Sequence, residues 1–488
     1  MKEGMLACLK LASGDQNGRV DSKRYIYFYK IQIPPIFFFY LFKLYYFFFL
    51  QFILNDKNVG EGAGNKEGND NIREINNLFK REDFNERIQE SETSLTDCNE
   101  STSDDSISSV DFNTEGWYLD EPKWGNVMKS CPEVRLASVE LYERIALDME
   151  LTVQRLIQQD NYNTVGNFIR FYNDYRDTSI CNPSEVSLSE FYRRYVPHLI
   201  DTEMTCVGLG LALLKRLDRE FGPSPGTYLV SSEEGVEDLS PYKNTHPSHV
   251  EGTEKEHVMV CMKVCIEDNG KERRGVLLLD PGYHVARAIT VMHDQKYPHT
   301  GWFTQCDEPW VKREFCYYFA PSNSDGSRSE YVIWETKETR AGGRVRHTNS
   351  LVYIGQPFNN PVEVTEKRNL VYEMRSWLSR NTKGEIVAGV YFPVRPLNEV
   401  QNDDDGPKFT LRHTELRHKT RTTIPFNKIL NNMLNDEERE QLERCNRQMG
   451  LCKGNLTTEL RKVALIFTDT DFVSQLLGIN NEINCLAS

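Results

Sequence analysis

The stretch EHVMVCMKVCIEDNGKERRGVLLLDPGYH, residues 256–284, decides the fold because two apolar runs flank a strong turn signal. Asn269–Gly270 is typical of a two-residue β-hairpin turn. Pairing about that turn places Asp280 opposite Met259. His257 therefore lies on the same face of the sheet as Asp280 and is its diagonal neighbour. This register predicts a hydrogen bond between the imidazole and the carboxylate. A four-residue loop would slide the two side chains apart, and a three-residue loop would put them on opposite faces.

The region around this hairpin has the short apolar segments, separated by turn residues, that are typical of an antiparallel sheet or barrel. The predicted strands are residues 227–231, 257–266, 275–280, 315–320, 330–336, 350–357 and 389–395. A helix is expected among the later strands, at residues 364–380.

The preceding part of the chain has helical periodicity instead. Helices are predicted at residues 132–159, 165–175, 184–200 and 203–217, and again in the tail at 434–449, 457–467 and 473–479. Helices followed by a sheet and then a mixed lobe predict an α+β fold.

These patterns suggest five regions along the 488-residue chain. Residues 1–54 are an aromatic-rich hydrophobic leader, and residues 55–115 are an acidic, Ser- and Asn-rich segment whose composition predicts disorder. Residues 116–225 form a helical subdomain, 226–360 a β-sheet or barrel subdomain, and 361–488 a C-terminal α/β lobe.

The leader contains a run, residues 31–54, that is long enough to span a bilayer. Pro34–Pro35, Lys43 and the excess of Phe and Tyr are unusual for a span. Three interpretations remain open: translated non-coding sequence, a membrane anchor, and an aggregation-prone or processed leader. We expect a cytoplasmic protein, with membrane anchoring through residues 31–54 as the alternative.

The net charge of −14 argues against nucleic acid as the main partner, because phosphate binding requires a basic surface. Twelve cysteines are scattered without a C-x-x-C pair, so that no structural zinc site is indicated. The simplest interpretation is a set of reduced thiols in the cytoplasm.

Cys206 directly follows a candidate N-cap, Thr205, in the segment EMTCVGLGLALLKRL. A cysteine here is either a small buried core residue or a nucleophile whose thiolate the helix dipole stabilises. His257 and Asp280 favour the second interpretation, because an imidazole can take the thiol proton and a carboxylate can stabilise the resulting charge. We therefore expect a catalytic triad of Cys206, His257 and Asp280.

Three segments, TCVGLGLALLKRL, KEHVMVCMKV and GVLLLDPGYHVAR, resemble arylamine N-acetyltransferases, within a wider group of Cys-His-Asp enzymes. The resemblance covers about residues 130–300 and, more faintly, the tail. It implies a cysteine-proteinase-like fold. It also implies transfer of an acyl group from acetyl-CoA or another acyl-CoA to a small-molecule amine, through a thioester on the cysteine. Where the family has Arg-Gly-Gly before its cysteine, this chain has Glu203, Met204 and Thr205.

Two other classes of function compete with this interpretation. One is a transglutaminase-like or other Cys-His-Asp hydrolase. The other is a non-catalytic scaffold that keeps the fold and binds partners through its acidic segments.

Some further residues are candidates for substrate or cofactor contacts. His284 lies four residues after Asp280 and is expected either near the pocket or in a surface loop. Arg340, Arg344 and Arg346 surround a Gly-Gly turn, where they could contact phosphate or form a solvated hairpin tip. Trp302 is a candidate for an aromatic pocket wall or for ordinary core packing.

Overall fold

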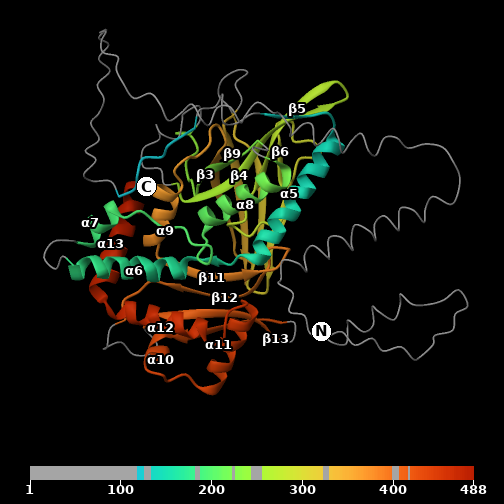
Figure 1. Cartoon of the computed structure of the whole chain (residues 1–488). Helices are drawn as coiled ribbons and strands as arrows, with labels where there is room; N and C mark the ends of the chain where they lie inside the picture. The colour runs from blue at the N-terminus through green and yellow to red at the C-terminus, as the bar shows by residue number, and fades with distance from the viewer. Residues whose placement is uncertain are drawn as a thin grey trace, which may run out of the picture. The chain divides into compact units, whose positions relative to one another are not determined.

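A computed structural model describes residues 118–125, 133–181, 187–222, 226–242, 255–321, 329–397, 406–415 and 418–487. The leader, residues 1–54, and the acidic segment, residues 55–115, lie outside these ranges. The fold is α+β, with a curled, largely antiparallel half-barrel sheet, a second smaller sheet and helices that pack on both (Figure 1). In the described part of the chain, no helix combines the length and the apolar character needed to span a bilayer.

The large sheet has the strand order β6-β5-β4-β3-β10-β9-β8-β7, and β1 pairs with β4 in parallel. Its strands are β1 (Val134–Leu136), β3 (Thr227–Glu233), β4 (His257–Asp268), β5 (Lys271–Leu279), β6 (Ile289–Met292), β7 (Phe303–Glu308), β8 (Val311–Phe319), β9 (Tyr331–Arg340) and β10 (Val345–Tyr353). The small sheet has the order β14-β13-β12-β11-β2. Its strands are β2 (Tyr162–Asn163), β11 (Met374–Arg380), β12 (Ile386–Pro393), β13 (Lys408–Glu415) and β14 (His418–Pro425).

Two long helices cover one face of the large sheet. They are α5 (Val139–Gln159) and α8 (Cys206–Phe221). Val260 and Met262 of β4 pack against these helices, whereas Met259 and Cys261 pack into a second apolar cluster on the other face. Because β4 is buried on both faces, its sequence is almost continuously apolar instead of alternating.

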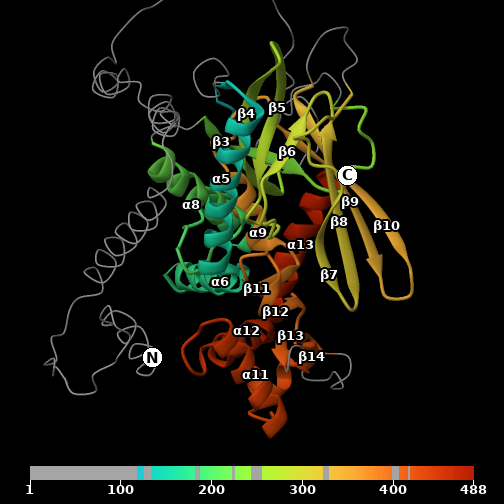
Figure 2. The ribbon, with the colours of Figure 1, turned by 90° about the vertical axis from the view of Figure 1, so that its right-hand side faces the viewer.

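A third apolar cluster lies between the small sheet and the remaining helices. These helices are α6 (Thr164–Cys181), α7 (Leu188–Arg194), α9 (Lys367–Val371), α10 (Phe426–Leu430), α11 (Asp436–Gln448), α12 (Asn455–Thr468) and α13 (Thr470–Ala487). A five-residue π-helix, η3 (Val362–Glu366), leads directly into α9. In the second view, the β7–β8 and β9–β10 strands extend beside β11, β13 and β14 (Figure 2).

The predicted hairpin register is confirmed. Asp268 pairs with Lys271 and Val260 with Leu279, with Asn269 and Gly270 at the turn. Both turn residues have positive φ, 53° and 74°, which is the backbone conformation that a tight primed turn requires. His257 begins β4 and Asp280 follows β5, so that both lie at the end of the hairpin away from the turn.

Three predicted helices differ clearly from the structure. The helix expected at residues 184–200 is only Leu188–Arg194 in the structure, because the chain is extended from Tyr195, two residues before Pro197. The helix expected at residues 132–159 starts at Val139, because Ser138 caps it and residues 134–136 form β1. The helix expected at residues 364–380 ends at Val371, and its second half is β11. In β11, which pairs with β12, Arg375 and Trp377 are buried against the packed helices, so that tertiary burial overrides the local helical pattern.

Gly384 provides a test of the contact between the small sheet and the loop that follows Asp280. It has φ +78°, and a Cβ there would lie 2.0 Å from the carbonyl oxygen of His284. Gly235 has φ +65° but no atom within 4 Å of such a Cβ. We expect Gly235→Ala to cost about 1–3 kcal/mol of unfolding free energy from backbone strain alone. Gly384→Ala should cost more, as measured by urea unfolding, and equal losses would contradict this close contact.

Candidate functional site

Cys206 is the first residue of α8, as the Thr205 cap predicts. The Thr205 side chain accepts a hydrogen bond from the backbone N–H of Val207 at 3.2 Å, which caps the helix. The Cys206 side chain is 3% exposed and packs with Val207, Val258 and Phe358. The thiol therefore lies at the positive end of the helix dipole, which favours a negative charge there.

His257 and Asp280 form a buried pair at the open end of the β4–β5 hairpin. His257 Nε2 lies 3.0 Å from Asp280 Oδ1, and the two side chains are 2% and 0% exposed. The backbone N–H of Tyr283 also donates to Asp280 Oδ1, at 3.0 Å. The hydrogen bond from Tyr283 fixes the position of the Asp280 carboxylate. Because the imidazole is hydrogen-bonded to that carboxylate, its orientation is fixed as well.

Cys206 and His257 meet across Gly282. A Cβ on Gly282 would lie 2.7 Å from Cys206 Cβ and 2.8 Å from His257 Cε1. The Cys206 thiol is close enough to the imidazole to help raise the pKa of His257. Because Asp280 takes Nε2, the ring nitrogen left for the thiol is Nδ1. The structure thus places the three residues expected from the sequence next to one another, with His257 between Asp280 and Cys206.

The charges around His257 favour its protonated form. Burial by itself lowers its pKa, but the charge of Asp280 and the hydrogen bonds with Asp280 and Cys206 outweigh burial. The net effect raises the pKa of His257 well above its usual value. The imidazole in this position can hold a proton at neutral pH, as a thiolate–imidazolium pair requires.

Two groups beside His257 were not expected from the sequence. The Tyr283 ring meets the imidazole edge-on, with centroids 4.6 Å apart, and its hydroxyl donates to Glu234. Loss of solvent raises the pKa of Glu234, although the charge of His257 acts in the opposite direction. Glu234 and His257 lie at the starts or ends of different strands, so that no local pattern relates them.

Glu366 is a second carboxylate that sequence patterns did not reveal. It is 1% exposed at the end of η3, where Thr205 donates its hydroxyl to Oε2 and Asn167 donates to Oε1 at 2.6 Å. Burial raises the pKa of Glu366 to about 7, against the hydrogen bond from Thr205 and the charge of Arg170. The N-cap of the cysteine-bearing helix is therefore joined to a titratable group from a distant segment.

His284 lies at the junction between the two sheets. Its Nδ1 accepts a hydrogen bond from Arg380 Nη1 at 2.8 Å, and Arg380 also donates to the carbonyls of Pro281 and Asp160. Desolvation and the positive charge of Arg380 lower the pKa of His284 well below its usual value. His284 is thus a neutral acceptor, and Arg380 of β11 anchors the loop that follows Asp280.

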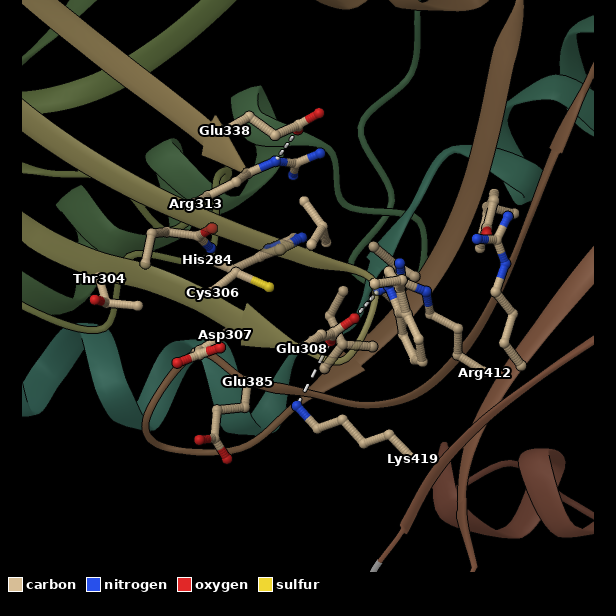
Figure 3. Close-up of a pocket in the computed structure, with 18 of the residues that line it drawn as sticks. His284, Thr304, Cys306, Asp307, Glu308, Arg313, Glu338, Glu385, Arg412 and Lys419 are labelled. Carbon is tan, nitrogen blue, oxygen red and sulfur yellow. Dashed lines mark hydrogen bonds and ion pairs between the residues drawn. The ribbon is translucent and has the colours of Figure 1, made fainter. Parts of the chain in front are cut away.

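His284 also lines a cavity of about 810 Å³ between the β7–β9 strands and the small sheet (Figure 3). Cys206, His257 and Asp280 are not among the lining residues. The charged lining comprises Arg313, Arg340, Lys383, Arg412, Lys419, Arg421, Asp307, Glu308, Glu338 and Glu385. Six basic and four acidic side chains make this cavity locally cationic in a chain whose net charge is −14.

Some of these charges neutralise one another. Glu338 pairs with both Arg313 and Arg340, at 2.7 Å in each case. Glu308 pairs with Arg412 at 3.1 Å and with Lys419 at 3.5 Å, as the dashed lines in Figure 3 mark. The cavity therefore presents paired charges on its wall in addition to its cations.

The remaining expected residues have different locations. Arg340 lines the cavity, whereas Arg344 and Arg346 are exposed on the β9–β10 hairpin tip. Trp302 is 49% exposed and does not line the cavity. Of the five candidates for substrate or cofactor contacts, only Arg340 and His284 thus lie on the cavity wall.

The chain was also compared with known proteins. Family models, curated proteins and solved structures gave no match to the chain. Among the residues that the structure describes, no group of three or more His, Cys, Asp or Glu side chains is arranged to hold a metal ion.

The buried carboxylate of Glu366 predicts a pH-dependent stability. Its pKa lies above the unfolded value of 4.5, so that the folded state binds more protons and loses stability as pH rises from about 4.5 to 7. The shift corresponds to about 3 kcal/mol. Glu366→Gln should remove this loss.

The measurement is urea unfolding of wild type and Glu366→Gln at pH 5 and pH 8. His257 contributes its own pH dependence equally to both proteins, so that the difference between them isolates Glu366. A pH-independent difference in unfolding free energy would contradict the prediction.

Proposed function

We propose that this chain is an acyltransferase that moves an acyl group from an acyl thioester, such as acetyl-CoA, to an amine through Cys206. The observation that carries the proposal is the buried His257–Asp280 hydrogen bond beside the thiol of Cys206, at the N-terminus of α8. A thiol, an imidazole and a carboxylate in this order supply a nucleophile, a base and a group that orients the base. The sequence resemblance to arylamine N-acetyltransferases supports the choice of acyl donor and acceptor.

In the first half of the proposed reaction, His257 holds the proton of Cys206, and the thiolate attacks the carbonyl carbon of the donor. A carbon–sulfur bond to Cys206 forms as the carbonyl electron pair moves onto oxygen. Collapse of this intermediate breaks the bond to the donor sulfur, which leaves with the proton from the imidazolium. Asp280 stabilises the imidazolium throughout and keeps Nδ1 directed at the sulfur.

In the second half, an amine attacks the thioester on Cys206 and gives its proton to His257. The carbon–sulfur bond then breaks and returns the thiolate–imidazolium pair. Backbone N–H groups near Cys206, other than that of Val207, which binds Thr205, are candidates to stabilise negative charge on the carbonyl oxygen.

The cavity beside His284 supports a role for this region in binding an anionic donor. Its lining carries more basic than acidic side chains, and Arg340 contributes to it. We assign Arg340, which is exposed at the cavity wall and paired with Glu338, to contact with the anionic part of the donor. Arg344 and Arg346 do not line the cavity.

The reactivity of Cys206 toward iodoacetamide tests the ion pair. At pH 6, we expect wild-type Cys206 to be alkylated about 10-fold or more faster than in His257→Ala, because the mutant lacks the base that holds the thiol proton. Asp280→Asn, which keeps the size of the side chain, should also slow the reaction. Peptide mass spectrometry measures each thiol separately.

Two other cysteines serve as controls in the same digest. Cys452 is exposed and gives the rate of an ordinary thiol. Burial raises the pKa of Cys445 to about 12, so that it should remain unlabelled. A Cys206 rate that is indifferent to His257 would exclude the ion pair and leave Cys206 as a core residue.

The acyl donor is tested by incubating the protein with acetyl-CoA and no amine. We expect saturable formation of one acetyl adduct on Cys206, which is absent in Cys206→Ser and is discharged by an added arylamine. Rapid release of free acetate without an amine would favour a hydrolase. Absence of any adduct from thioesters or activated esters would favour the non-catalytic scaffold.

A further inference from the structure

A segment far along the chain lies against the nucleophile. The π-helix η3 and the helix α9 run from Val362 to Val371, and Val364 packs in the same apolar cluster as Cys206 and Val207. π-helical turns are rare and occur frequently at functional sites. This segment supplies two polar side chains to the start of α8.

The first of these side chains, Glu366, binds the N-cap residue. Its Oε2 accepts the hydroxyl of Thr205, the residue immediately before Cys206. The second, Asn369, lies three residues later and reaches the sulfur itself. Asn369 Nδ2 is 3.8 Å from Cys206 Sγ and donates to it.

Hydrogen bonds from a buried arginine fix the backbone at Asn369. Arg375 of β11 is 1% exposed and donates from Nη1 to the Asn369 carbonyl oxygen at 2.6 Å, and from Nη2 to the carbonyl oxygen of Leu370. The Arg375 guanidinium also lies 4.8 Å above the Phe168 ring. The amide of Asn369 is therefore carried on an anchored turn, which is what a preorganised donor needs.

The start of α8 leaves a place for a donor from another segment. The backbone N–H of Val207, directly after the nucleophile, is already taken by the Thr205 hydroxyl. Asn369 is only partly buried, whereas Cys206 is buried.

We propose that Asn369 is a further catalytic residue, whose side-chain amide donates a hydrogen bond to the oxygen that becomes negative when Cys206 attacks an acyl carbonyl. This inference rests on the proposed function. The new carbon–sulfur bond pushes the carbonyl electron pair onto oxygen, and the Asn369 N–H stabilises that oxygen without transferring its proton. Because oxygen and sulfur are bonded to the same carbon, a donor in contact with the sulfur is within reach of the oxygen.

The test separates acylation from alkylation. Acylation of Cys206 by p-nitrophenyl acetate passes through an intermediate in which the carbonyl oxygen is negatively charged. The acylation rate is measured from the burst of released p-nitrophenolate. Alkylation by iodoacetamide forms no such oxygen. We expect Asn369→Leu, which keeps the size of the side chain but has no N–H, to slow acylation by about 100- to 1,000-fold. Its alkylation rate should stay within about 3-fold of wild type.

Two further variants control for structural effects. Asn369→Gln keeps an amide donor and should recover part of the acylation rate. If Asn369→Leu fails to fold, the test is whether Asn369→Gln slows acylation more than it slows alkylation. Asn481→Leu makes the same change at an exposed position of α13 and should leave both rates unchanged.

The outcomes are distinguishable. Equal loss of acylation and alkylation in Asn369→Leu, or no loss of either, would overturn the role of Asn369 and leave the proposed function intact. Wild-type protein that is alkylated quickly but never acylated would overturn the proposed function, and this inference with it.

Discussion

The arrangement around Cys206 depends on one buried hydrogen bond, between His257 and Asp280. Neither side chain has access to water, so that a carboxylate here is tolerated only because it faces a proton donor on the imidazole and a backbone N–H from Tyr283. Loss of one member of such a buried pair typically costs about 3–5 kcal/mol, because the other charge remains without a partner. The same pair that would serve catalysis therefore also holds together the open end of the β4–β5 hairpin.

The small sheet supports this pair from outside the hairpin. Arg380 at the end of β11 holds the loop after Asp280 through the Pro281 carbonyl, and Gly384 in the following turn packs against the same loop. Arg375, at the other end of β11, holds the turn that carries Asn369. Two buried arginines on one strand thus fix two sides of the site, which explains why a strand remote from Cys206 carries so much buried charge.

The sequence was informative where the controlling interaction is local. Asn269–Gly270 determines the register that pairs His257 with Asp280, and Thr205 determines where α8 begins. Both signals act over a few residues, so that they can be read without knowledge of the tertiary structure. The α+β class follows from the change in periodicity along the chain.

The sequence was uninformative where distant segments meet. Glu366 and Asn369 lie more than 150 positions from the residues that they contact, and they belong to a stretch whose periodicity predicted one long helix. That stretch divides into η3, α9 and β11 because its second half is buried beside β12 and β2. Residues with no local signature, such as Glu234, are found only when the folded chain places them beside His257.

The hairpin also constrains how the length of this gene product can vary. His257 and Asp280 lie 23 positions apart, and residues 260–279 between them form the paired ladder and its two-residue turn. A single residue inserted into or deleted from one of these strands alone would turn one partner to the opposite face of the sheet. Related chains that keep this pair should therefore change in length at the turn, or equally in both strands, and not in one strand alone unless a β-bulge absorbs the change. The position of length changes between the histidine and the aspartate is then a simple filter for recognising homologues whose sequences have otherwise diverged.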